Sequence, residues 1–140
     1  MQTKHVAAAI IYENERILAC RRSGGGMEGG WEFPGGKVEV GEKPEGALRR
    51  ELAEELGVEL QLVWLYDTVE YDYPDFHLSM DCFVCTLEPG QEPHAHEGVH
   101  DELRWLTKNE LLDVDWLPAD LGLIQSLGLF WDNAFQAEHY

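Results

Sequence analysis

The first part of the chain alternates strand-length apolar runs with short polar breaks. His5–Tyr12 is a nearly continuous apolar run, and a second run, Arg16–Arg21, follows after three polar residues. Two such runs joined by a short polar segment are typical of a β-hairpin. The next segment, Ser23–Gly30, holds five glycines in eight residues and is expected to form a loop. It lacks the Gly-Lys-Ser/Thr ending of a Walker-type phosphate loop.

Pro44–Leu56 carries the clearest helical pattern in the sequence. Leu48, Leu52 and Leu56 recur at every fourth position and give the segment one apolar face. Proline suits the first turn of a helix, and the glycine after the last leucine, Gly57, suits the left-handed cap that ends one. We therefore expect a helix that packs this leucine stripe against the core.

The second half of the chain adds more strands and a second helix. Val58–Tyr73 and His77–Leu87 have the pattern of long strands around a Pro-Asp turn, Glu102–Leu106 is a shorter candidate strand, and Leu117–Leu129 is apolar at helical spacing. Together these elements predict an α+β fold, an α/β/α sandwich with a mixed β-sheet between helices. The length of 140 residues predicts a single domain, 1–140.

The charge of the chain limits what it can bind. There are 27 Asp and Glu residues against 10 Lys and Arg residues, which gives a formal net charge of -17. An acidic surface repels a phosphate backbone, so long nucleic acid is not an expected partner. A small phosphorylated ligand is compatible with this charge if divalent cations lie between its phosphates and the protein carboxylates.

The cysteines and the apolar segments favour a protein of the cytoplasm. Three cysteines are an odd number, which fits a reducing compartment better than a disulfide framework. Cys82 and Cys85 have metal-site spacing, but they lie in a strand-like run without a second pair, so buried thiols are expected. No signal-peptide pattern and no run of 18 apolar residues is present, and no membrane partner is predicted.

Three carboxylates share one face of the predicted helix. Glu51, Glu54 and Glu55 stand at positions i, i+3 and i+4, and each like-charge pair at these spacings costs an isolated helix a few tenths of a kcal/mol. A positive partner is expected to offset the repulsion. Hard oxygen ligands suit Mg²⁺, Mn²⁺ or Ca²⁺, and Mg²⁺ usually takes only one or two carboxylates and completes its shell with water and substrate phosphate.

The residues around this cluster resemble a known family. From Gly36 the chain continues with five residues, Glu42, seven residues, and then Arg50-Glu51-Leu52-Ala53-Glu54-Glu55-Leu56-Gly57-Val58. Every fixed position of the Nudix box is matched, so the chain resembles a Nudix hydrolase. Trp31–Lys37, Glu70–Asp75 and Leu117–Asp120 are similar to the MutT-type branch of that family, including its CTP pyrophosphohydrolase and 8-oxo-dGTP diphosphatase members.

The resemblance covers about residues 4–128 and implies the Nudix fold. It also implies dependence on Mg²⁺, for which Mn²⁺ can substitute, and attack of water on a phosphorus of a diphosphate linkage. The remaining segment, 129–140, is rich in aromatic residues. This tail is expected either to pack on the core or to form a dimer contact, and the chain is expected to be a monomer or a homodimer.

The resemblance also implies roles for the residues of the box. Glu54 and Glu55 correspond to the principal metal ligands, and Glu51 to a position that binds metal and orients or deprotonates the attacking water. The carbonyl oxygen of Gly35 corresponds to a backbone ligand of the metal. Arg50 corresponds to the arginine that holds the catalytic carboxylates in place, which makes it part of the catalytic group.

Two further acidic positions have both a metal-binding role and an alternative role. Glu42 corresponds to the box glutamate near the helix start, where a structural role is an equal alternative. Glu97 lies where MutT-type proteins carry another acidic metal ligand or catalytic base on a loop; the alternative is a solvated loop glutamate. The nearby His94, His96 and His100 lack a partner with zinc-site spacing and are interpreted as exposed loop histidines.

Four residues are candidates for substrate binding. Arg22 corresponds to an arginine that contacts phosphate, or is an ordinary surface arginine. Phe33 and Phe76 are candidates for contacts with the nucleobase, or for packing in the core. Asp120 stands where relatives selective for oxidised guanine carry Asn. An ionised Asp only accepts hydrogen bonds, which suits the amino group of cytosine; the alternative is that Asp120 caps the helix starting there.

The combined prediction is a Mg²⁺-dependent nucleoside triphosphate pyrophosphohydrolase that releases a nucleoside monophosphate and pyrophosphate. The favoured substrates are (d)CTP or modified pyrimidine nucleotides, in sanitisation of the nucleotide pool, with 8-oxo-dGTP as the second choice. Hydrolysis of dinucleoside polyphosphates or nucleotide sugars is an alternative within the family. A catalytically silent Nudix domain that senses nucleotide, or a simple acidic interaction module, is the alternative of another class.

Overall fold

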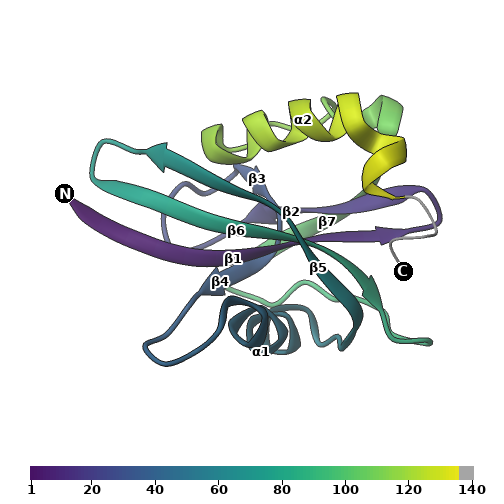
Figure 1. Cartoon of the computed structure of the whole chain (residues 1–140), viewed down its shortest axis with the longest axis horizontal. Helices are drawn as coiled ribbons and strands as arrows, with labels where there is room; N and C mark the ends of the chain where they lie inside the picture. Colours follow the sequence, from purple (N-terminus) through teal and green to yellow (C-terminus); the bar gives the residue numbers. More distant parts are fainter. Residues whose placement is uncertain (136–140) are drawn as a thin grey trace.

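The computed structural model describes residues 1–135, which form one seven-stranded sheet and two principal helices (Figure 1). The strands are β1 (Gln2–Glu13), β2 (Arg16–Arg22), β3 (Trp31–Glu32), β4 (Gly35–Lys37), β5 (Leu60–Asp72), β6 (Phe76–Leu87) and β7 (His100–Thr107). The helices are α1 (Pro44–Leu56) and α2 (Pro118–Ala134), with a short 3₁₀ turn, η1 (Lys108–Glu110), between β7 and α2.

The sheet is mixed. Its main path runs β3-β2-β1-β6-β5, while β4 pairs with β1 and β7 pairs with β2. The central pair, β1 and β6, is parallel over ten residue pairs from Gln2–Phe76 to Ile11–Cys85, and all other pairs are antiparallel. The predicted mixed sheet between helices is therefore confirmed.

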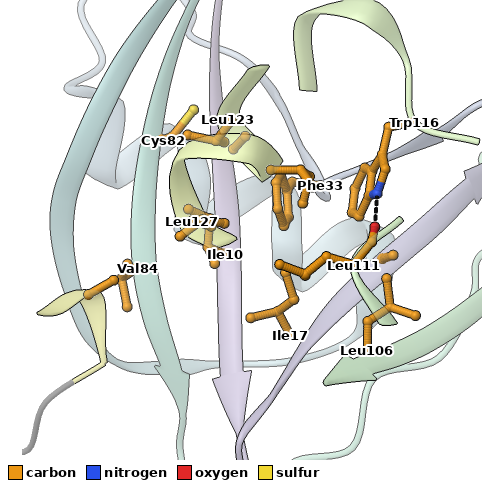
Figure 2. Close-up of a cluster of buried hydrophobic side chains, with 14 of the residues drawn as sticks. Ile10, Ile17, Phe33, Cys82, Val84, Leu106, Leu111, Trp116, Leu123 and Leu127 are labelled. Carbon is orange, nitrogen blue, oxygen red and sulfur yellow. Dashed lines mark hydrogen bonds between the residues drawn. The ribbon is translucent and has the colours of Figure 1, made fainter. Parts of the chain in front are cut away.

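Each face of the sheet is covered by one helix (Figure 1). Alternate residues of β1 pack into the cores on the two faces of the sheet, because successive side chains of a strand point in opposite directions. Ala7 and Ala9 belong to the core beneath α1, whereas Ala8 and Ile10 belong to the core beneath α2. Figure 2 shows the second of these cores, where Leu123 and Leu127 of α2 and other buried side chains meet the sheet.

Helix α1 forms where the leucine spacing predicts it. Leu48, Leu52 and Leu56 are at most 1% exposed and face the sheet. The helix ends at Gly57, whose φ of 69° is a left-handed conformation and whose N–H donates to the carbonyl of Ala53 at 3.1 Å. Glycine adopts this conformation at little cost, which explains why the helix stops here.

The predicted hairpin of two strands around a tight turn is confirmed, but the pairing within it is short. β1 and β2 pair only at Tyr12–Ile17 and Glu13–Arg16, beside the turn residues Asn14 and Glu15. Beyond these pairs the two strands separate, because β1 pairs with β6 and β4 while β2 pairs with β7 and β3. The apolar runs identify the strands, but buried strands in the centre of a sheet need partners on both sides, and these come from distant segments.

Two of the three aromatic residues in 129–135 pack on the core, whereas Phe130 is 52% exposed. Trp131 and Phe135 are 7% and 8% exposed. The Phe135 ring stacks on Tyr12 with 4.2 Å between ring centroids, and Trp131 meets Tyr12 edge-on at 6.1 Å. Helix α2 thus extends beyond the predicted end at Leu129, with a kink at Phe130. The rest of the predicted tail, 136–140, lies outside the described residues.

The cysteines are buried and free, which was predicted for Cys82 and Cys85 and is an addition for Cys20. Burial raises the pKa of each of these thiols above its ordinary value, so all three behave as apolar core groups. No helix within residues 1–135 is long and apolar enough to cross a membrane.

The leucine stripe of α1 should dominate the stability that this helix contributes. We expect Leu52→Ala to lower the free energy of unfolding by about 2–5 kcal/mol, because it removes a fully buried side chain and leaves a cavity. Leu129→Ala in α2 removes a leucine that is 81% exposed and should change it by less than about 0.5 kcal/mol. Urea denaturation measures both; equal effects would contradict the packing described here.

Candidate functional site

A cavity of about 690 Å³ opens on the α2 side of the sheet. Its floor is formed by β1 and β6, one wall by the glycine-rich loop 23–30, and its inner end by the start of α2. Phe33, Phe76 and Asp120 line it. Gly35 and Glu55 also border the cavity, so the cavity reaches from the start of α2 to the C-terminal half of α1.

The three carboxylates of α1 have different environments. The Glu51 side chain is 16% exposed and is held by Arg50, whereas the Glu54 side chain is 63% exposed. Glu55 is half-buried, and it is the one member of the trio that lines the cavity. Within residues 1–135 no three His, Cys, Asp or Glu side chains are grouped so that they could hold a metal ion by themselves.

Arg50 is the positive group that the clustered carboxylates require. Its guanidinium donates to both oxygens of Glu42 at 2.9 Å, to Glu51 at 2.8 Å and to the carbonyl of Lys37 at 3.1 Å. The Arg50 hydrogen bonds, together with the N–H of Glu39, lower the pKa of Glu42 to about 2. Both carboxylate oxygens of Glu42 therefore accept hydrogen bonds from Arg50, and Glu42 orients the Arg50 guanidinium.

Within residues 1–135, no cation forms a hydrogen bond or ion pair with Glu55. Its Oε2 accepts the N–H of Gly35 at 3.3 Å. Burial, followed by the negative charges of Glu51 and Glu32, raises the pKa of Glu55 to about 8. A carboxyl group in this state is stabilised in its ionised form by an opposite charge nearby, so a divalent cation is a fitting partner for it.

Two consecutive glycines allow α1 to lie this close to the sheet. Gly35 and Gly36 pair with Ala8 and Ala7 of β1. A methyl group on Gly35 would collide with the carbonyl oxygen of Ala7, and one on Gly36 would collide with the carboxylate of Glu51. The absence of side chains here brings the metal-ligand candidates against the edge of the cavity.

Asp120 lies at the inner end of the cavity and is 4% exposed. Its Oδ1 accepts the N–H of Phe33 at 3.2 Å. Burial, followed by the charge of Glu32, raises the pKa of Asp120 to about 8. The alternative that Asp120 caps α2 is wrong, because Leu117 occupies the N-cap position and Asp120 lies inside the first turn.

Phe33 and Phe76 are placed differently around the cavity. Phe33 is 4% exposed, and its ring packs on Trp116 in the core beneath α2, with 5.0 Å between the ring centroids (Figure 2). Phe76 is half-buried, and Lys4 lies over its ring with Nζ 4.1 Å from the centroid. Phe33 is thus mainly a core residue that also borders the cavity, whereas Phe76 forms part of its rim with a cation beside it.

Arg22 lines the cavity but donates to protein groups. Its guanidinium hydrogen-bonds Glu32 at 3.0 Å and the carbonyls of Gly24, Gly25 and Gly26 at 3.2, 3.1 and 2.7 Å. Glu32 and these carbonyls were not singled out from the sequence. The arginine therefore organises the glycine-rich loop in this structure.

The histidines predicted as exposed loop residues divide into two groups. His94 and His96 are exposed. His100 was predicted wrongly: it begins β7, is 2% exposed and lies 3.0 Å from Glu32 through Nε2. Glu97 is exposed on the preceding loop, while the next residues, Gly98 and Val99, line the cavity.

Comparison with known proteins agrees with this arrangement. A family model described as the NUDIX domain matches residues 2–127. The chain belongs to the Nudix family. An 8-oxo-dGTP diphosphatase of Escherichia coli strain K12 is 37% identical over 129 residues, covering 91% of this chain and 98% of that protein. A CTP pyrophosphohydrolase of the same organism is 32% identical over 142 residues, covering 90% and 92%.

A solved structure supports the same assignment. The crystal structure of a MutT NUDIX hydrolase from Burkholderia pseudomallei superposes with a TM-score of 0.80 and 27% identity, covering 89% of this chain and 98% of that one. The chain is therefore a Nudix hydrolase with the predicted α+β sandwich, related to nucleotide diphosphatases. Nudix hydrolases generally use a divalent metal, and the carboxylates of α1 are the hard oxygen donors that such an ion prefers.

The buried Asp120 should make the stability of this Nudix domain depend on pH. Its folded pKa of about 8 lies above the ordinary 3.8, so the unfolded chain releases this proton first. Stability from this group is fully present below about pH 4 and is lost as pH rises to about 8. Asp120→Asn removes this loss. In the absence of metal, the thermal midpoint of Asp120→Asn relative to wild type should rise as pH increases from about 4 to about 8. A difference that does not change with pH would contradict the raised pKa of Asp120.

Proposed function

We propose that the chain is a Mg²⁺-dependent pyrophosphohydrolase of nucleoside triphosphates, which yields a nucleoside monophosphate and pyrophosphate. The observation that carries the proposal is the layout of the cavity. Both Asp120, a buried carboxyl group suited to a nucleobase at the start of α2, and Glu55, a half-buried carboxyl group at the end of α1, line it. Within residues 1–135 no cation forms an ion pair with Glu55. A nucleotide placed along the cavity would direct its phosphates toward α1.

The metal-binding residues follow from the donor set near Glu55. Glu54 and Glu55 are the main candidate ligands, with Glu51, Glu97 and the carbonyl oxygen of Gly35 as additional ones. A bound Mg²⁺ would neutralise phosphate charge and lower the pKa of a coordinated water. Because few protein ligands are gathered in advance, the phosphates of the substrate are expected to complete the coordination shell.

The chain's own residues orient the reaction. The oxygen of a water molecule forms a bond to the β-phosphorus, the bond from that phosphorus to the bridging oxygen of the α-phosphate breaks, and a carboxylate accepts the water proton. Glu51 suits this role because Arg50 fixes its orientation. Glu97, exposed on its loop, is the second candidate for the same role.

The base preference depends on the protonation state of Asp120. The preference for cytosine assumed an ionised carboxylate that only accepts hydrogen bonds. With a pKa of about 8, Asp120 is mostly protonated at neutral pH, and a protonated carboxyl group both donates and accepts. It then offers the same pair of hydrogen bonds as an amide, which can match guanine O6 and its neighbouring N–H as well as cytosine.

Two substrates are therefore proposed, 8-oxo-dGTP and (d)CTP, the latter including modified pyrimidine nucleotides. The names of the relatives support both, and the relative called an 8-oxo-dGTP diphosphatase has the higher identity. Either activity would remove unwanted nucleotides from the pool.

Product analysis tests the reaction. With Mg²⁺, canonical and oxidised (d)NTPs should release pyrophosphate, and Glu54→Gln should lower kcat/KM by roughly 100-fold or more, since even outer-shell partners of a metal are worth about 10–100-fold. Glu45→Gln, an exposed carboxylate on the same helix that pairs with Arg49, is the matched control. Nucleotide binding without turnover would instead indicate a sensor, and turnover only of dinucleotide substrates would replace this proposal.

A pH series tests the neutral form of Asp120. If the protonated carboxyl group binds the base, kcat/KM of the wild type relative to Asp120→Asn should fall as pH rises through about 8. The ratio cancels titrations at the metal site, which both proteins share. A ratio that rises with pH would show that the ionised form binds the substrate and would restore the argument for cytosine.

A further inference from the structure

The glycine-rich loop is fixed by one side chain. Arg22 stands at the end of β2 and donates to three successive carbonyls of the loop, those of Gly24, Gly25 and Gly26. A guanidinium group has five N–H donors, and these three bonds together with the bond to Glu32 occupy most of them. The loop thus has a defined shape although it is rich in glycine.

Arg22 is itself held from two neighbouring strands. Glu32, in β3, accepts from Arg22 through Oε1 at 3.0 Å and from His100 Nε2 through Oε2 at 3.0 Å. The His100 side chain, in β7, is completely buried. β3 and β7 pair with opposite edges of β2, so the chain His100–Glu32–Arg22 crosses three adjacent strands and ends at the loop.

The same loop contacts the segment that carries Glu97. The N–H of Ser23 donates to the carbonyl of Val99 at 2.9 Å. A methyl group on Gly24 would collide with the carbonyl oxygen of Gly98. Because Gly24–Met27 and Gly98–Val99 together line the cavity, the position of one segment fixes the position of the other.

We propose that Glu32 and His100 are positioning residues, which hold Arg22 as a latch on the glycine-rich loop and thereby shape the nucleotide cavity. The inference rests on the proposed function, since the cavity is taken to bind the nucleotide. Arg22 then acts by ordering the loop. Direct contact of Arg22 with phosphate is the competing role, and it requires neither Glu32 nor a buried histidine 78 positions away in sequence.

Hydrogen exchange of the substrate-free protein tests the latch without using activity. His100→Leu removes the donor to Glu32, whereas His100→Gln retains an N–H that can reach it. We expect amide exchange in residues 23–30 to become about tenfold faster in His100→Leu and to stay near the wild-type rate in His100→Gln. Unchanged exchange in folded His100→Leu would overturn the proposal.

A second variant covers the case in which His100→Leu does not fold. Arg22→Lys keeps the charge but cannot donate to three carbonyls and Glu32 together, so it should also accelerate exchange of the loop. Arg21→Lys is the matched control, because Arg21 pairs with Asp101 and Glu102 outside the cavity. Equal exchange in both lysine variants would overturn the latch.

Steady-state kinetics separate positioning from simple stability. Loosening the loop should raise KM about three- to tenfold with kcat within about twofold, because it weakens binding without touching the reacting atoms. His100→Gln should restore KM. A lower thermal midpoint with an unchanged KM would reduce His100 to a structural role and overturn the proposal. If His100→Leu accelerates amide exchange in the loop but the wild type hydrolyses no nucleoside triphosphate, the latch would be supported and the proposed function would be contradicted.

Discussion

The close contact of β4 with both β1 and α1 is the constraint on which the site depends. Gly35 leaves no room for a methyl group between β4 and the backbone of β1, and Gly36 leaves none between β4 and the Glu51 side chain of α1. Their contact lets Glu55 reach the backbone N–H of Gly35 and places Glu51 beside Gly36. If α1 were displaced from β4, the carboxylates would move away from the cavity that is proposed to receive the phosphates.

This contact brings several carboxylates close together, and their mutual repulsion is reduced in two ways. Arg50 neutralises Glu42 and Glu51 through direct hydrogen bonds. Asp120 is instead buried and Glu55 half-buried, both near Glu32, and their pKa values rise to about 8. Lys4 and Arg22 are the only cationic residues in the described part of the chain that line the cavity, and Arg22 donates its hydrogen bonds to the loop and Glu32. A triphosphate would therefore need metal ions to enter so acidic a site.

Local sequence signals predicted the parts of the fold that local chemistry controls. The spacing of Leu48, Leu52 and Leu56 and the glycine after them define α1, and the same segment carries the Nudix box. The hairpin turn between β1 and β2 was predicted correctly. The pairing of β1 with β6 was not predicted, because it joins residues more than 70 positions apart. Strands β3 and β4 have two and three residues, too few for any periodic pattern.

For the candidate site, as for the fold, the local sequence predicted some features and missed those that depend on long-range contacts. The box identified the carboxylates and Arg50, but the environment of Asp120 depends on burial, which reversed the premise that it is ionised. Glu32 and His100 were missed because they are joined only when β3 and β7 flank β2; nothing in the local sequence of either residue indicates the bond. A buried histidine beside a half-buried carboxylate becomes visible only once strand register is known.

We propose that the carboxylates at the end of α1 bind a divalent cation together with the nucleotide. Counting bound Mn²⁺ by electron paramagnetic resonance, with a non-hydrolysable nucleoside triphosphate present, tests it directly. The wild type should bind Mn²⁺, Glu55→Gln should lose that binding, and Glu59→Gln, which changes an exposed carboxylate just beyond the helix, should retain it. Equal Mn²⁺ binding by wild type and Glu55→Gln would contradict metal binding by the carboxylates of α1.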